Sequence, residues 1–330
     1  MSMKIGVIEN SQFFGRTFWE FLDVIREVGI KYIQLPCRPG STWSSGRVGT
    51  DPLYGSEELC IFPVEYADPT TLRPSLELKE RIESYGVTVT SFYHNCEWMA
   101  ALTLGDTQLD IEADRIMELC DIANKWNVPV IRASEGPAER HRFGYTKLIR
   151  DFSKRRCIEQ VRKALQRCIK HAEDTGVYLA LENHGVLLQD ADELVSMIKA
   201  IGSDYLGANV DTGNFAYAGA LPETLKGYYK TIAPYTLSTH IKDVQRQWDV
   251  KKPPTLMQRA SAWGSANQRI VWECPVGDGD AEIKSFVNEL KKNSKFRKIG
   301  TLNIQQESGD PRVARIDMLK RSFAYLKSIV

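Results

Sequence analysis

The stretch that decides the fold lies in the second half of the chain and reads Gly207-Ala-Asn-Val-Asp-Thr-Gly-Asn-Phe215. It predicts a short strand that ends in a polar, glycine-containing turn, with the carboxylate of Asp211 at the last strand position. Two other predicted strands also end in a potential metal ligand. Glu182 lies 29 residues before Asp211, and His240 lies 29 residues after it. Because a strand and its crossover helix take about thirty residues, three consecutive units each end in a candidate ligand.

The same alternation of strand and helix extends over the rest of the chain. Strands are predicted at 4–9, 32–35, 87–93, 128–133, 177–182, 205–211, 235–241 and 300–307. Helices are predicted at 17–28, 75–85, 111–126, 152–175, 192–201, 222–232, 281–292 and 311–329. Eight βα units without a linker predict a single (β/α)8 barrel domain over residues 1–330. A doubly wound sheet is the alternative, but it more often has fewer strands or splits into domains.

Two insertions interrupt the minimal barrel, at 36–71 after the second strand and at 244–279 after the seventh. Both follow the carboxyl ends of strands, where barrel enzymes place their active sites. Both are rich in aromatic residues. Loops of this length inside a compact domain are usually lids or oligomer contacts, so we expect them to cover the site or to bind another subunit.

The composition is that of a soluble globular protein, with 43% hydrophobic and 26% charged residues. A net charge of +1 favours neither nucleic acid nor an anionic membrane as a partner. Seven cysteines, odd in number and without a C-x-x-C pair, argue against a disulfide framework and a structural zinc site. The sequence shows neither a signal peptide nor a membrane-spanning run, so we expect a cytoplasmic protein.

Strand parity supports the proposed ligands, because side chains alternate between the two faces of a strand. Each candidate shares its face with small or polar residues, while aliphatic residues such as Leu237 and Ile241 around His240 are predicted to face the helices. The predicted inward sets are Tyr178, Ala180 and Glu182; Gly207, Asn209 and Asp211; Thr236, Ser238 and His240; and Asn303, Gln305 and Glu307.

Three carboxylates and one imidazole form an oxygen-rich set that suits one divalent ion, Mn²⁺ or Mg²⁺ first, with Co²⁺ or Zn²⁺ as alternatives. A bound cation polarises a substrate carbonyl or hydroxyl and acidifies the neighbouring C–H, which a flanking carboxylate can remove. A strand-end glutamate can instead pair with Lys242 or Arg132. His184 and His94 each follow a strand end, where they can face substrate or cap a loop.

Four motifs resemble the xylose isomerase-like TIM-barrel superfamily, in particular its sugar phosphate isomerase/epimerase branch, which includes ketose 3-epimerases and inosose dehydratases. They are Leu181-Glu-Asn-His-Gly185, Asp211-Thr-Gly-Asn-Phe215, His240-Ile-Lys-Asp-Val244 and Val276-Gly-Asp-Gly-Asp280.

The resemblance implies one metal ion, commonly Mn²⁺, held by Glu182, Asp211, His240 and a glutamate at the end of the eighth strand. It also implies that the first and last glutamates, Glu182 and Glu307, act as paired acid and base. It further implies that Arg246, six residues after the histidine, contacts substrate. We add His184, Asn214, His94 and Lys242 as candidate substrate contacts.

The chain departs from the ketose 3-epimerase pattern at two positions. Asn214 stands where those enzymes usually carry histidine. The simplest alignment of the last strand places Gln305 at the ligand position, and we assign the ligand to Glu307 because the site needs a third carboxylate.

The expected function is therefore a metal-dependent isomerase or epimerase of a small sugar or polyol derivative. A lyase that dehydrates a keto-inositol or cleaves a 3-oxo-C-glycoside is the first alternative. A non-catalytic sugar-binding barrel is the second. The insertions also allow a homo-oligomer or a partner subunit.

Overall fold

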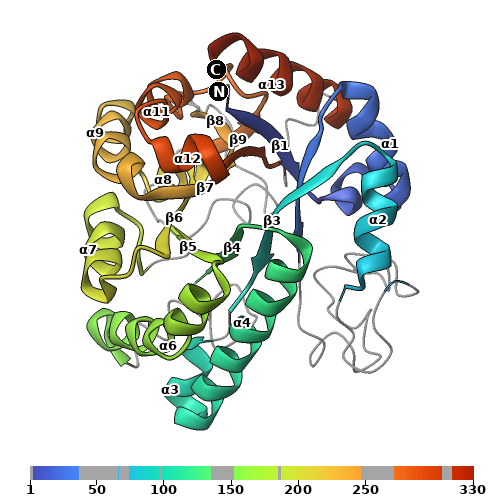
Figure 1. Cartoon of the computed structure of the whole chain (residues 1–330). Coiled ribbons are helices and arrows are strands. Elements are labelled where there is room, and N and C mark those ends of the chain that lie inside the picture. The colour runs from blue at the N-terminus through green and yellow to red at the C-terminus, as the bar shows by residue number, and fades with distance from the viewer. Residues whose placement is uncertain are drawn as a thin grey trace.

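The parallel strands close into a barrel in the order β1-β10-β7-β6-β5-β4-β3-β2 (Figure 1). The computed structural model of the chain describes residues 3–36, 66, 74–96, 98–134, 152–184, 187–246, 271–306 and 314–330. The predicted closed (β/α)8 barrel is confirmed. The barrel strands are β1 (Lys4–Ile8), β2 (Tyr32–Pro36), β3 (Thr88–His94), β4 (Val130–Ala133), β5 (Tyr178–Glu182), β6 (Leu206–Asp211), β7 (Thr236–Ile241) and β10 (Thr301–Ile304).

Helices surround the barrel and cover the outer face of the strands (Figure 1). The eight predicted helices are observed as α1 (Phe18–Val28), α2 (Leu76–Ser84), α4 (Asp106–Trp126), α6 (Lys154–Thr175), α7 (Ala191–Ile201), α9 (Pro222–Ile232), α11 (Ile283–Leu290) and α13 (Arg315–Ile329). In α6 the apolar residues repeat at helical spacing, so Val161, Leu165 and Cys168 are all buried. The helix ends at Gly176, whose φ of 72° is the left-handed conformation that favours glycine.

Shorter elements that the sequence pattern did not predict complete the described fold. They are η1 (Ser11–Phe14), η3 (Trp98–Ala100), α3 (Ala101–Leu104), α8 (Thr212–Tyr217), η4 (Ala233–Tyr235), β8 (Asp243–Arg246), β9 (Val271–Cys274) and α12 (Ser294–Ile299). The turn predicted after Asp211 is in fact helix α8, because the Asp211 side chain accepts a hydrogen bond from the Asn214 amide and caps it. β8 and β9 pair antiparallel, so the second insertion begins and ends in a two-stranded ribbon. The expected lid or oligomer contacts fall largely at 37–73 and 247–270, outside the described residues.

The parity prediction for Leu237 was wrong. Leu237 faces the barrel interior, where it packs with Val130 and Ala180. The pairing of β6 with β7 shifts register between Ala208 and Asn209, so Leu237 is an extra residue in β7. A Cβ added to Gly207 would lie 2.6 Å from Leu237 Cγ. The leucine thus occupies the space beside a residue without a side chain, which strict alternation cannot anticipate.

The strands separate an apolar layer from a polar one. Outward residues of the strands join the helices in one buried apolar cluster, which includes Ile33, Leu181, Val210, Ile241 and Leu302. Inside the barrel, Gln34, Asn209, His240 and Asn303 are buried although they are polar. Buried polar groups are costly unless they are paired or bind a ligand. This interior is therefore where function is expected.

The cysteines Cys96, Cys120, Cys157, Cys168 and Cys274 are buried and free. Within the described residues, no helix is long and apolar enough to cross a membrane.

Candidate metal centre

Glu182, Asp211 and His240 meet inside the barrel at the carboxyl ends of three neighbouring strands, β5, β6 and β7. One ligand atom from each lies within 4.8 Å of the others, and all three residues are buried. His240 Nδ1 lies 2.5 Å from Glu182 Oε1 and 3.8 Å from Asp211 Oδ2. The structure thus brings together three of the four residues that the sequence predicts as ligands.

Asn183, which follows the first candidate ligand, ties the end of β5 to the end of β6. Its side-chain nitrogen donates to the Asp211 carbonyl at 2.9 Å, and its side-chain oxygen accepts from the Asp211 amide at 2.8 Å. These two hydrogen bonds replace the backbone pairing that a longer β5 strand would make with β6. They hold the backbones of Glu182 and Asp211 at a fixed distance from each other.

Thr212 makes the equivalent link from β6 to β7. Its hydroxyl donates to the Lys242 carbonyl at 2.6 Å and accepts from the Lys242 amide at 3.0 Å. The residue after each of the first two candidate ligands therefore holds the end of the next strand. Sequence reasoning gave neither Asn183 nor Thr212 a role, although both lie inside the quoted motifs.

Asp243 joins two of the quoted motifs. Its carboxylate accepts hydrogen bonds from the amides of Val244, Gly277, Gly279 and Ala281 at 2.8–3.1 Å. Burial raises the pKa of Asp243, while these four amides favour its ionised form. A Cβ on Gly279 would lie 2.3 Å from Asp243 Oδ1. The loop before α11 therefore needs glycine at this position to approach the carboxylate.

Two buried cations accompany the candidate ligands. Arg132, on β4, forms an ion pair with Glu182 Oε2. Lys242 Nζ lies 3.1 Å from Asp211 Oδ2. The Glu182–Arg132 pair proposed as an alternative thus forms at a candidate ligand itself, and Lys242 pairs with Asp211. Lys242, a predicted substrate contact, lies within this centre.

The pKa values of the two carboxylates shift in opposite directions. Burial by itself would raise the pKa of Glu182, but Arg132 and then His240 hold that pKa well below its usual range. For Asp211, burial raises the pKa and the negative charge of Glu182 adds to the effect, against the opposing charge of Lys242. Glu182 is therefore the more firmly ionised of the pair.

The three residues fit a divalent cation on the geometry of their own atoms. His240 Nδ1 and Asp211 Oδ2 are buried and make no hydrogen bond of ordinary geometry within the described residues, although charged groups lie close. In a neutral imidazole with the proton on Nε2, the Nδ1 lone pair faces a carboxylate oxygen. A cation bound by both atoms would replace this repulsion with two metal–ligand bonds. Ligand distances near 2.1 Å place neighbouring ligand atoms about 3 Å apart, so a small movement of Glu182 suffices.

The other predicted site residues are placed less completely. His184 follows Glu182 by two residues, and its positive charge contributes to the low pKa of that carboxyl. The backbone amide of Asn214 donates a hydrogen bond to Asp211 Oδ1. Arg246 ends β8, and its side chain is not described. Glu307 lies outside the described residues, so its roles as ligand and base stay predictions. Gln305, the other candidate at the end of the last barrel strand, β10, is 8% exposed, and its backbone N–H donates to the Ile241 carbonyl at 3.2 Å.

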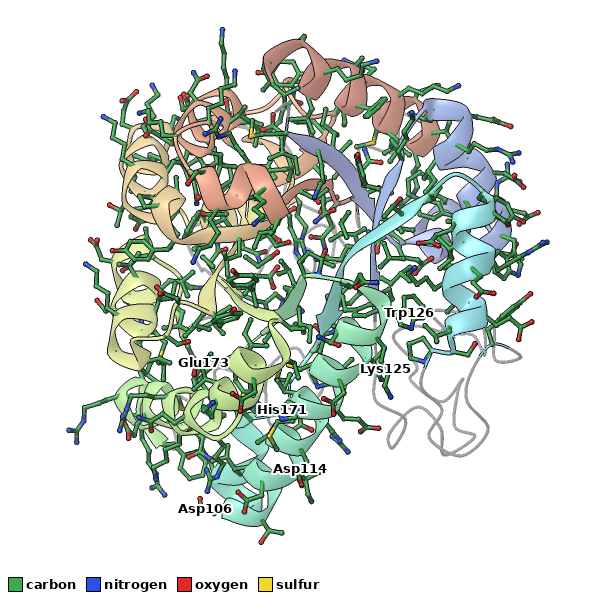
Figure 2. All side chains as sticks on the ribbon, in the orientation of Figure 1. Asp106, Asp114, Lys125, Trp126, His171 and Glu173 are labelled. Atoms are coloured by element: carbon green, nitrogen blue, oxygen red, sulfur yellow. The ribbon has the colours of Figure 1, made fainter. Side chains whose placement is uncertain are left out.

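Two histidines lie on the helix side of the barrel. His94 ends β3, and its Nε2 lies 3.5 Å from Glu112 Oε2 of α4. Its predicted contact with substrate remains untested. His171 lies at the surface. Its Nε2 lies 2.8 Å from Asp121 Oδ1, between α6 and α4 at the outside of the barrel (Figure 2).

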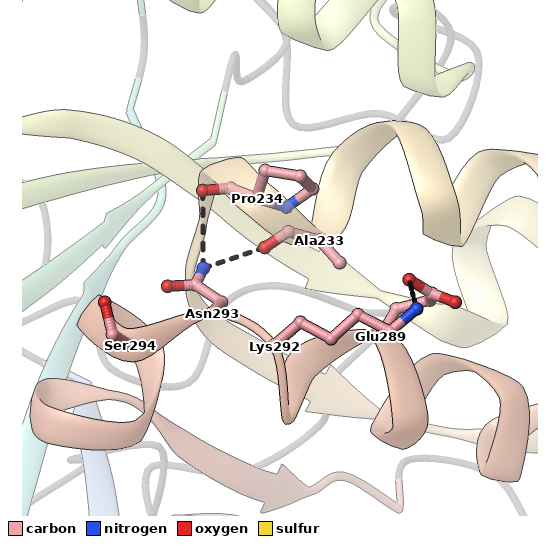
Figure 3. Close-up of a pocket in the computed structure, with 6 residues that line it drawn as sticks. All are labelled: Ala233, Pro234, Glu289, Lys292, Asn293 and Ser294. Carbon is pink, nitrogen blue, oxygen red and sulfur yellow. Dashed lines mark hydrogen bonds and ion pairs between the residues drawn. The ribbon is translucent and has the colours of Figure 1, made fainter.

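A shallow pocket of about 280 Å³ lies at the other end of the strands. It is lined by Ala233, Pro234, Glu289, Lys292, Asn293 and Ser294. The Asn293 side chain donates to the carbonyls of Ala233 and Pro234 just before β7 begins (Figure 3). This pocket is remote from the candidate ligands, because it borders the amino end of β7 and they lie at the carboxyl ends.

Comparison with known proteins gives the same fold. A xylose isomerase-like TIM barrel protein from Mycobacterium smegmatis in complex with magnesium has a TM-score of 0.62 at 16% identity, covering 99% of this chain and 96% of that one. An L-ribulose 3-epimerase has a TM-score of 0.62 at 12% identity, covering 99% and 94%. The probable 3-DHS dehydratase AsbF of petrobactin synthesis from Bacillus anthracis has a TM-score of 0.60 at 15% identity, covering 98% and 99%.

A search of curated proteins found no match to the chain. The family described as xylose isomerase-like TIM barrel matches residues 22–329. That range includes all eight helices around the barrel except the start of α1, together with the three candidate ligands. The chain therefore belongs to the xylose isomerase-like TIM barrel family.

Proposed function

We propose that the chain is a divalent-metal-dependent isomerase or epimerase that removes a proton next to a carbonyl of a sugar or polyol derivative. The observation that carries the proposal is the convergence of Glu182, Asp211 and His240 at the carboxyl end of the barrel. Family membership supports it, as does the presence of a 3-epimerase among the solved structures of the same fold. Mn²⁺ is the expected ion, with Mg²⁺, Co²⁺ and Zn²⁺ as the alternatives.

A bound cation would polarise the substrate oxygen next to the carbon that loses its proton. The chain supplies the rest. Glu182, Asp211 and His240 hold the cation, and Glu307 is the proposed fourth ligand. His184, Asn214 and Lys242 are the proposed contacts to the substrate, with His94 and Arg246. Glu182 and Glu307 are the proposed acid and base on either side of the substrate carbon, as the resemblance implies.

The contacts of the Glu182 carboxylate favour a lyase as the second candidate. Both oxygens of Glu182 already have partners, because Oε1 contacts His240 and accepts from Asn209, while Oε2 pairs with Arg132. Epimerisation by two carboxylates needs Glu182 to exchange a proton with substrate, so one contact has to be released. β-Elimination needs one base and a leaving group. Dehydration of a keto-inositol or cleavage of a 3-oxo-C-glycoside is compatible with a Glu182 that only binds metal.

Metal analysis of the purified protein tests the shared part of both candidates. We expect one equivalent of divalent metal in the wild type and a large loss in Glu182→Gln and His240→Ala. His171→Ala is the matched control, because His171 pairs with a carboxylate at the surface. Substoichiometric metal in the wild type, with unchanged content in both variants, would contradict a metalloenzyme and favour a non-catalytic barrel.

Incubation with candidate ketoses and keto-inositols in deuterated water separates the two chemistries. An epimerase gives an isomeric product that carries deuterium on the epimerised carbon. A lyase gives a product lighter by water or by an aglycone. Turnover of neither type in the metal-loaded protein, over a panel that covers both classes, would leave sugar binding as the remaining function of the fold.

A further inference from the structure

The side-chain amide of Gln34, on another strand of the barrel, contacts His240 at the ring nitrogen that does not face the two carboxylates. Gln34 Oε1 lies 2.7 Å from His240 Nε2, and Gln34 Nε2 donates to Ser91 Oγ at 2.9 Å. Gln34 and Ser91 are 0% and 2% exposed. Gln34 comes from β2, which is separated from β7 by β1 and β10. Sequence reasoning missed it, although a glutamine between Ile33 and Leu35 in a buried strand is the signal of an inward polar residue.

The contact decides which ring nitrogen carries the proton. An amide oxygen can only accept a hydrogen bond, so His240 Nε2 has to donate. As placed, the amide uses both of its polar atoms, because its nitrogen donates to Ser91 Oγ while its oxygen contacts the ring. With the proton on Nε2, the neutral ring presents its lone pair at Nδ1. That nitrogen is the atom 2.5 Å from Glu182 and 3.8 Å from Asp211.

The backbone is adapted to this arrangement. The pairing of β2 with β3 shifts register between Ile33 and Gln34, which places Gln34 opposite Ser91 rather than opposite Thr90. The irregularity therefore brings the donor and acceptor of the Gln34–Ser91 hydrogen bond onto the same inward face.

We propose that Gln34 is a positioning residue of the metal centre, acting on His240. It fixes His240 in the Nε2–H tautomer and turns Nδ1 toward the two carboxylates, and Ser91 holds the Gln34 amide in place. The proposal rests on the metal-dependent function proposed above. Partners of this kind behind a metal-binding histidine typically contribute 10–100-fold in metal affinity.

The test measures metal affinity by competition with a chelator, and the His240 tautomer by ¹⁵N–¹H correlation of histidine-labelled, metal-free protein with a neutral ring. Gln34→Met keeps the side-chain length but removes the acceptor, and we expect about 10–100-fold weaker binding and a mixture of tautomers. Gln34→Glu restores an acceptor oxygen and is expected to restore the tautomer. Ser91→Ala is expected to give a smaller loss. Gln160→Met, in a buried glutamine of α6, controls for losing an amide from the core.

Each outcome decides the proposal. Wild-type metal affinity and a pure Nε2–H tautomer in folded Gln34→Met would overturn it, as would an Nδ1–H tautomer in the wild type. If the wild type binds no metal, the proposed function fails, and the tautomer measurement still decides the role of Gln34. Circular dichroism and thermal unfolding of each variant show whether a loss reflects misfolding.

Discussion

Arg132 and Lys242 place two positive charges against two of the candidate ligands, Glu182 and Asp211. Moving ions out of water costs several kcal/mol each, so such pairs are weak sources of stability. What they provide here is geometry. Arg132 occupies Glu182 Oε2 and leaves Oε1 facing His240. The two oxygens of Asp211 likewise have different partners. Oδ1 caps α8, and Oδ2 faces Lys242 and His240.

Glu9, next to the end of β1, gives a prediction about pH. Burial raises its pKa to about 7 from 4.5, despite hydrogen bonds from Ser11. Between these values the unfolded chain loses its proton first, so the contribution of Glu9 to stability is full below about pH 4.5 and is lost as pH rises through about 7. Glu9→Gln stays neutral and keeps an acceptor for Ser11. We expect its stability relative to wild type to rise by up to about 3 kcal/mol between pH 4.5 and pH 8.

Urea unfolding at several pH values across this range measures the difference directly. Glu27→Gln, at an exposed position of α1, is the control for losing one negative charge. A gap between wild type and Glu9→Gln that stays constant with pH would show that Glu9 has an ordinary pKa in the folded protein.

At the scale of elements, side chains rather than further strand pairing hold the strand ends in position. Asn183 links β5 to β6, Thr212 links β6 to β7, and Asp243 links the end of β7 to the loop before α11. Each bridge follows a candidate ligand by one to three residues. The strand ends can therefore be held together without occupying the ligand side chains themselves.

Thr212→Val tests such a bridge, because valine has nearly the same shape but cannot hydrogen-bond. We expect a loss of about 1–3 kcal/mol in the free energy of unfolding, since the buried amide and carbonyl of Lys242 lose their partner. We also expect weaker metal binding, because β6 and β7 carry Asp211 and His240. Thr236→Val is the matched control. Its hydroxyl donates to the Ile232 carbonyl at the amino end of β7, so it should lower stability without changing metal affinity. Equal effects of both variants on metal affinity would contradict a specific role for Thr212.

At the scale of the molecule, the barrel brings together candidate ligands that lie up to 58 positions apart in the sequence, as Glu182 and His240 do. The strands already fix their backbones, so little chain entropy remains to be lost when a cation binds. Metal binding should therefore appear almost entirely as added stability of the folded state.

Divalent metal at 100 times its dissociation constant should add about 2.7 kcal/mol to the free energy of unfolding. In a chain of this length that corresponds to a rise of about 4 °C in the thermal midpoint. Differential scanning fluorimetry of chelator-treated protein, with and without added metal, measures it. The rise should vanish in His240→Ala and persist in His171→Ala. An equal rise in both variants would indicate binding elsewhere on the protein.

Much of the fold could be predicted from local patterns, because those patterns record local physics. The period of apolar residues in α6 and the glycine after it reflect burial and chain geometry within one helix. The polar ends of β5, β6 and β7 reflect parity within single strands. Helix α8 was missed, because the capping by Asp211 looks like an ordinary polar turn. Leu237 was misplaced, because the bulge depends on space beside Gly207 in a neighbouring strand.

The sequence by itself determined the barrel, its family and three of the candidate ligands, since each depends on spacing and on residue type along the chain. Only the tertiary structure decided how those ligands are held. The Arg132–Glu182 pair, the Asn183 and Thr212 bridges and the Gln34–His240 contact join residues from different strands. The last of these spans 206 positions in the sequence. Such contacts depend on register and barrel closure, which place side chains together irrespective of their distance along the chain.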